Sequence, residues 1–130
     1  MSAVDDLVTL FPPAGSLEVQ KEFWRDTERS DQALILFRSE GGSVANTLED
    51  QPVMVMVVQD RDETLVVSSA RNALESLKVD IMEYDFSDAP NGLYNVDIVG
   101  GILPVQMKDG RKGFSMNLIA RYGRTEAIRL

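Results

Sequence analysis

Apolar and polar residues recur with two different periods, and the period changes along the chain. Residues 2–11 (SAVDDLVTLF) place their apolar side chains at helical spacing, with Ser2 as a candidate N-cap and Pro12-Pro13 as a stop. Residues 17–24 (LEVQKEFW) and 32–39 (QALILFRS) have the composition and pattern of strands. The first third of the chain therefore predicts one short helix followed by two strands.

The middle of the chain contains the clearest strand and the clearest helix. Residues 52–60 (PVMVMVVQD) are almost continuous in Val and Met, which predicts a strand covered on both faces. From residue 62 to residue 78 the period becomes helical, and Asp60 followed by Glu63 resembles a capping box. The apolar stripe of this helix consists of Val66, Ala70, Ala73 and Leu77.

The last third predicts a connector and a long hairpin. Residues 79–92 form the connector, and strands are expected at 93–108 and 114–124, joined by the turn KDGRKG. Gly100-Gly101 predicts a bend or bulge in the first of these strands. The order α-β-β-β-α-β-β is that of an α+β domain, in which two helices pack on a mainly antiparallel sheet with a long C-terminal β-hairpin.

Length and composition set the class of protein. The 130 residues fit a single domain, 1–130, and 44% of them are hydrophobic, which is enough for a buried core. No apolar run approaches the roughly 18 residues of a membrane span, and the acidic N-terminus does not resemble a secretory signal. We therefore expect a globular protein that is neither secreted nor membrane-bound.

The chain has no histidine and no cysteine, and this restricts its chemistry. Catalytic triads, cysteine nucleophiles and histidine- or thiolate-based metal sites all need one of these residues. The stretch DRDE at 60–63 offers three carboxylates, but it lacks the ligand spacing of a calcium loop, and acids are common at a helix N-terminus. We expect no catalytic residue, no cofactor and no metal, and hence no enzyme.

The stretch RSEGGSVAN at 38–46 is the most distinctive loop. A phosphate-binding loop needs a Lys after its glycines and a helix after the loop, whereas this loop is followed by a strand and contains an acid. Paired glycines allow the chain to reverse between two strands. The residues expected to shape this loop or to contact a neighbouring molecule are Arg38, Glu40, Gly41, Gly42 and Asn46.

The net charge of −8 is unevenly distributed. Residues 1–107 contain 19 acidic and 7 basic residues, a net charge of −12, while residues 108–130 contain 2 acidic and 6 basic residues, a net charge of +4. An acidic body disfavours nucleic acid as a bound partner but suits copies that meet head to tail. The basic residues expected to dock are Arg111, Lys112, Arg121 and Arg124, although a solvated surface would show the same composition.

The ordered set of motifs resembles a known family over residues 2–124. An apolar strand runs into LFRSEGGSVAN and is followed by the strand QPVMVMVVQD and a helix containing SARNALESL. A strand interrupted by glycines, the turn KDGRKGF and a final strand that ends near Tyr122 complete the set. In this order the motifs are similar to those of the tail terminator proteins of long-tailed bacteriophages, also called tail completion or minor capsid proteins.

This resemblance implies a structural role in virion assembly. Such proteins form a ring, usually a hexamer, on the tail tube, stop its polymerisation and present a surface to the head connector. The implied partners are other copies of the chain, the tail-tube protein and the head-completion or connector protein. DNA would only pass through the lumen, and no membrane is involved. The implied location is the head-proximal end of the tail in the virion, after assembly in the host bacterial cytoplasm.

Two other interpretations remain open on the sequence. One is another head-tail adaptor or tail-tube component, because such proteins are close in size and role. The other is a small acidic ligand-binding or regulatory α+β domain. A tube subunit would be expected to have a long hairpin loop for stacking, and the long hairpin of this chain is terminal.

Overall fold

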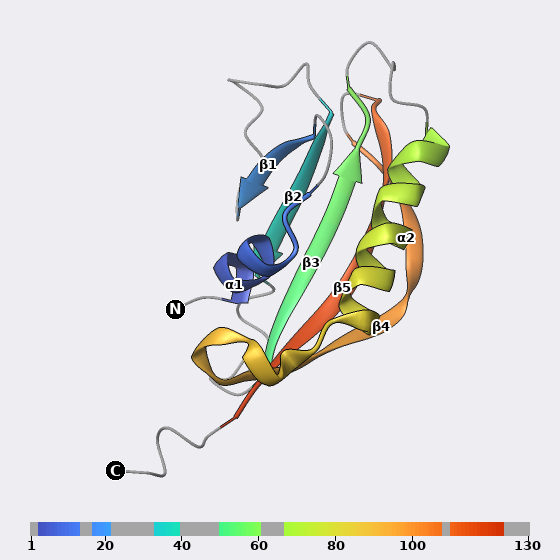
Figure 1. Cartoon of the computed structure of the whole chain (residues 1–130). Coiled ribbons are helices and arrows are strands. Elements are labelled where there is room, and N and C mark those ends of the chain that lie inside the picture. The colour runs from blue at the N-terminus through green and yellow to red at the C-terminus, as the bar shows by residue number, and fades with distance from the viewer. Residues whose placement is uncertain are drawn as a thin grey trace.

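The computed structural model describes residues 3–13, 17–21, 33–39, 50–60, 67–107 and 110–123. Within these ranges the chain forms two α-helices on a five-stranded sheet (Figure 1). The elements are α1 (Ala3–Leu10), β1 (Glu18–Lys21), β2 (Leu34–Ser39), β3 (Asp50–Val58), α2 (Val67–Glu83), the short 3-10 helices η1 (Phe86–Asp88) and η2 (Pro90–Gly92), β4 (Leu93–Gln106) and β5 (Lys112–Tyr122). The predicted order and the α+β class are confirmed.

The sheet has the strand order β1-β2-β3-β5-β4. Strand β1 runs parallel to β2, and the other three neighbouring pairs are antiparallel. The β4–β5 register shifts between Val99 and Leu103, and Gly100 there has a φ of 73°. This irregularity confirms the bulge predicted at the glycine pair, because a left-handed backbone conformation favours glycine.

Helix α2 is longer than the sequence indicated. The predicted connector begins at residue 79, but the helix continues to Glu83, and the following turns belong to η1 and η2. Ile81 is only 2% exposed and extends the buried stripe of Ala70, Leu74 and Leu77 by one more turn. Asp80 and Glu83 lie in these last turns, and the burial of Ile81 outweighs their weak cost near a helix C-terminus.

Both helices cover the same face of the sheet, and the main core lies between them and the strands. Alternate residues of β3, namely Val53, Val55 and Val57, point into this core and are fully buried. The opposite face carries a smaller cluster that includes Met56 and Val58. Strand β3 is therefore covered on both faces at this end, as its continuous apolar sequence predicted.

A buried carboxylate ties the two ends of the fold together. Asp6 of α1 is 5% exposed and accepts hydrogen bonds from the Tyr122 hydroxyl at 2.6 Å and from Asn91 Nδ2 at 2.9 Å. Asn91 lies in η2 with a φ of 62°, and Gly92 next to it accepts a hydrogen bond from the Gly123 amide. The N-terminal helix, the turn before β4 and the end of β5 thus meet at one carboxylate.

The ionisation of Tyr122 predicts how stability depends on pH. Burial, followed by the hydrogen bond and the charge of Asp6, raises the pKa of Tyr122 well above its ordinary value of about 10. The unfolded state therefore releases the phenolic proton at a lower pH than the folded state. The contribution to stability is fully present below about pH 10 and is lost as the pH rises through the folded pKa.

We expect the free energy of unfolding to fall above about pH 10, and to fall less steeply in Tyr122→Phe. Urea unfolding at a series of alkaline pH values measures the two slopes. Tyr94→Phe is the matched control because Tyr94 is 57% exposed, and its slope should equal that of the wild type. Equal slopes in Tyr122→Phe and the wild type would contradict the assignment.

Candidate functional site

The turn between β4 and β5 places two of the expected docking residues at one end of the sheet. Lys112 is exposed, whereas Arg111 is only 4% exposed. The Arg111 carbonyl accepts a hydrogen bond from the Met107 amide at 2.7 Å, which closes the hairpin. Arg111 therefore belongs to the packing of this end, and Lys112 is the side chain of the two that a partner can reach.

Arg121 lies in the sheet and bridges two acids. Its Nη1 contacts Asp50 Oδ1 of β3 at 3.1 Å, and its Nε donates to Asp97 Oδ2 of β4. The hydrogen bond with Asp97 is the main cause of a raised Arg121 pKa. Because Arg121 spans three adjacent strands, reversing its charge would disturb the sheet as well as any docking surface.

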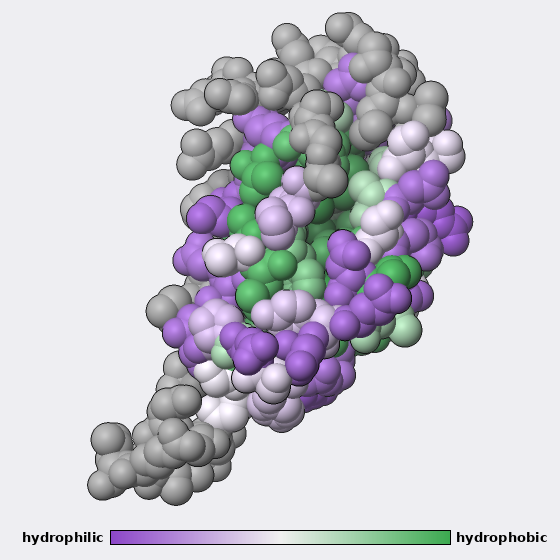
Figure 2. Space-filling view, in the orientation of Figure 1, coloured by the Kyte–Doolittle hydropathy of each residue, from purple (hydrophilic) through white to green (hydrophobic). Residues whose placement is uncertain are grey.

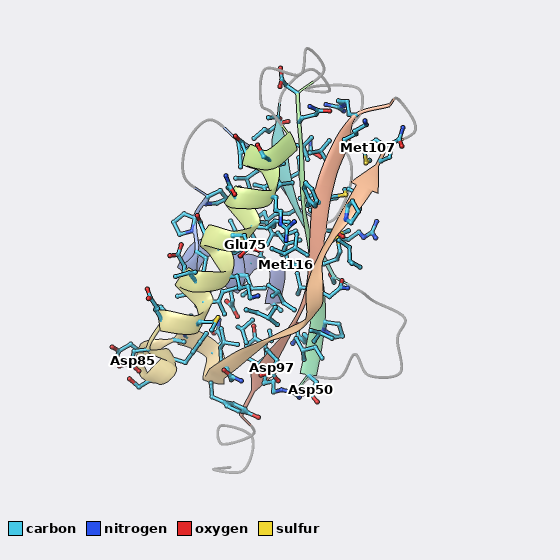
Figure 3. All side chains as sticks on the ribbon, turned by 90° about the vertical axis from the view of Figure 1, so that its right-hand side faces the viewer. Asp50, Glu75, Asp85, Asp97, Met107 and Met116 are labelled. Atoms are coloured by element: carbon cyan, nitrogen blue, oxygen red, sulfur yellow. The ribbon has the colours of Figure 1, made fainter. Side chains whose placement is uncertain are left out.

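The expected basic cluster is divided between the two ends of β5. Lys112 and Arg121 are nine residues apart on one strand, which corresponds to about 30 Å. In Figure 3, Met107 lies at the hairpin end of the sheet, and Asp50 and Asp97, which bind Arg121, lie together at the opposite end. The structure therefore does not bring these basic residues together in one patch.

The loop residues are described only in part. Arg38 is exposed near the end of β2, where it lies opposite Met54 of β3. Of the other sequence-predicted contacts, Glu40, Gly41, Gly42, Asn46 and Arg124 lie outside the described residues. Their roles at an interface stay predictions.

Four acidic residues are exposed together at the end of α2, and the sequence did not indicate this location. Asp80 and Glu83 lie in the last two turns of α2, and Asp85 and Asp88 follow in and beside η1. All four are exposed, and within the described ranges no Lys or Arg forms an ion pair with them. We call these four residues the acidic surface. Its signal in the sequence was a run of four acids without a base between residues 80 and 88.

A groove lies between the end of α1 and helix α2, directly beside the acidic surface. Its volume is about 180 Å³, and it is more apolar than polar. Figure 2 shows hydrophobic residues gathered in the strip between the two helices, with hydrophilic residues on the outer side of α2. The described residues that line it are Phe11, Pro12, Pro13, Leu17, Ile35, Ala73, Ser76, Leu77 and Asp80.

The groove continues toward the C-terminal end of α2. A shallower hollow is lined by Leu10, Phe11, Pro12, Asp80, Glu83 and Tyr84, so two members of the acidic surface form its rim. The narrower part is below the roughly 300–1,000 Å³ of typical small-molecule pockets. Its size and shape suit a few side chains of a peptide segment.

Strand β4 provides a second exposed apolar surface. It is an edge strand of the sheet and exposes Tyr94 by 57%, Val99 by 44% and Leu103 by 57%. An edge strand with exposed apolar side chains and few charges is a surface on which another protein can pack. The bulge at Gly100 and the proline at 104 limit continuous strand pairing to the part before the bulge.

The described part of the chain was also compared with the expectations for a metal site and a membrane span. Within it, no group of three or more Asp, Glu, His or Cys residues is arranged to hold a metal ion. Asp60 of the DRDE stretch is 9% exposed, and residues 61–63 lie outside the described ranges. None of the described helices has the length and apolarity needed to cross a membrane.

Comparison with the sequence models of known protein families identifies a match. The sequence model of a family described as phage tail termination protein matches residues 4–124. This range includes every described strand, all of α2 and nearly all of α1. No curated protein matches the chain.

Proposed function

Because this chain belongs to the phage tail termination protein family, we propose that it forms a closed ring, a hexamer, on the end of the tail tube. The ring stops polymerisation of the tube protein and offers its free face to the head-completion or connector protein. DNA passes through its lumen without being held, on the hypothesis that acidic residues of this chain, whose net charge is −8, face the lumen and repel phosphates. The chain acts as a structural protein without catalysis or cofactor.

The observation that carries this proposal is the extent of the family match. It spans residues 4–124 and thus the helices and the whole sheet together, rather than one appended module. The function is therefore assigned to the entire α+β domain. The same match supports a place in the virion tail, and we propose that the protein occupies its head-proximal end after assembly in the host bacterial cytoplasm.

The described surfaces support a ring of identical contacts. In such a ring each copy uses two different patches, one for each neighbour. The acidic surface at the end of α2 is opposite in sign to the C-terminal part of the sequence, residues 108–130, which carries a net charge of +4. The exposed apolar residues of β4 add surface that a neighbouring copy or the tube protein can bury.

Ring formation is the first expected outcome. The purified full-length chain should form rings at high concentration or on the ends of purified tail tubes, and it should stop tube growth when added to polymerising tube protein. Light scattering across a concentration series, with negative-stain imaging, measures both effects.

The same experiment separates the alternatives. A tail-tube subunit would stack into tubes that keep growing, whereas a terminator forms rings or caps of constant length. A strict monomer that neither forms rings nor caps tubes would contradict the proposal and favour a ligand-binding or regulatory domain.

A further inference from the structure

We propose that the groove between α1 and α2 binds the C-terminal segment, residues 124–130, of a neighbouring copy in the ring. This inference rests on the proposed ring and identifies one of its contacts. The groove is apolar, and Asp80 and Glu83 form its acidic rim. Its occupant should therefore combine apolar side chains with positive charge.

The C-terminal segment has this chemistry. Its sequence is RTEAIRL, and its two arginines and one glutamate give its side chains a net charge of +1. In an extended segment, successive side chains point to opposite sides. Ile128 and Leu130 can then enter the groove together while Arg129 points toward the rim.

The length of the segment matches the groove. Seven extended residues span at most about 25 Å. The groove follows α2 from Ala73 to Glu83, which corresponds to about 15 Å at 1.5 Å per helical residue. The segment is long enough to fill the groove with two or three residues left to reach it.

The direction of β5 favours a groove on another copy. Strand β5 runs antiparallel to β3, toward the end of the molecule where α2 terminates (Figure 1). To enter the groove of its own copy, the chain after Gly123 would have to reverse direction and run back along α2. A copy placed head to tail receives the segment without this reversal, as a ring of heterologous contacts requires.

The first test measures binding to the groove without relying on the ring. The probe is a fluorescent peptide with the sequence of residues 123–130, and the receptor is the full-length chain carrying Ile128→Asp and Leu130→Asp, so that its own segment is disabled. Fluorescence anisotropy should show saturable binding of this peptide. A peptide with the same two aspartates should not bind.

Matched variants of the receptor locate the binding. Asp80→Lys reverses a charge on the rim and should weaken binding of the peptide by about fivefold. Asp88→Lys reverses an exposed charge away from the groove and should change the affinity little. Ser76→Trp should fill the groove and abolish binding, and Met82→Trp on the same helix should not. Circular dichroism verifies that each variant is folded. Equal effects within either pair would overturn the assignment.

The second test shows whether docking is between copies. The chain with Ile128→Asp and Leu130→Asp lacks a competent segment, and the Ser76→Trp chain lacks a competent groove, so neither should form closed rings alone. When mixed, they have one competent segment and one competent groove and should form a pair that grows no further. Light scattering measures this complementation, and absence of the pair would overturn docking between copies.

The outcomes distinguish this inference from the proposed function. If the chain with the disabled segment still forms rings and the peptide does not bind, the inference is wrong and the ring remains. If the wild type forms neither rings nor caps, the proposed function is wrong, and so is the assignment to a neighbour.

Discussion

Replacing Gly113 by alanine should lower the free energy of unfolding by about 3–5 kcal/mol, among the largest effects of any single methyl group in this fold. Gly113 lies on β5 beside Val58 of β3. A Cβ atom at this position would overlap the Val57 carbonyl oxygen and would lie 2.9 Å from the Val58 Cα. Both are backbone atoms of a buried strand, so the overlap can be relieved only by moving strands apart.

Gly101→Ala is the matched control, because a Cβ there meets nothing within 4 Å and the backbone conformation is not left-handed. We expect its stability to differ from the wild type by less than about 0.5 kcal/mol. Urea unfolding of both variants measures the difference. Similar stabilities of the two variants would show that the β3–β5 pair is not packed as closely as the structure has it.

Replacing Phe11 by alanine should lower the free energy of unfolding by about 3–5 kcal/mol, and it also removes one of the side chains that line the groove. Phe11 is 6% exposed and packs edge-on against Tyr84, with ring centroids 5.3 Å apart, and against Phe86 at 6.4 Å. These contacts join the end of α1 to the end of α2 and to η1. The loss combines the transfer of a large apolar side chain with the cavity that it leaves.

Two further variants calibrate this prediction. Phe11→Leu keeps much of the apolar volume and should cost clearly less than Phe11→Ala. Met82→Ala, in which the replaced side chain is 70% exposed, should change the free energy of unfolding by less than about 0.5 kcal/mol. Chemical denaturation measures all three, and an effect of Phe11→Ala no larger than that of Met82→Ala would contradict the described aromatic cluster.

Much of the fold could be predicted because local patterns and tertiary packing agree. The Val and Met run of β3, the Pro12-Pro13 stop after α1 and the Gly100-Gly101 bulge each have a local physical cause. The end of α2 could not be placed from the sequence, since the last turn depends on the burial of Ile81 against the sheet. This turn contains two acids, Asp80 and Glu83, and the contact that stabilises it is the burial of Ile81 in the core.

The candidate surfaces were less predictable than the fold. Arg111, Lys112 and Arg121 are close in sequence and equal in charge, so they looked like one basic patch. The strand β5 separates Lys112 from Arg121 by about 30 Å and sets Arg121 between Asp50 and Asp97, and Arg111, just before β5, is buried. Charged residues can be counted in the sequence, but the sequence does not show which of them form ion pairs with a neighbouring strand.

The sequence by itself determined the order of elements, the α+β class, the absence of histidine and cysteine chemistry, and the uneven charge that favours head-to-tail assembly. These properties depend on residue identity and on spacing along the chain. Only the tertiary structure decided that α1 and α2 lie on the same face with an apolar groove between them, and that Asp80 and Glu83 form its rim. That juxtaposition joins residues about 70 positions apart, and it arises because both helices bury their apolar stripes against one sheet.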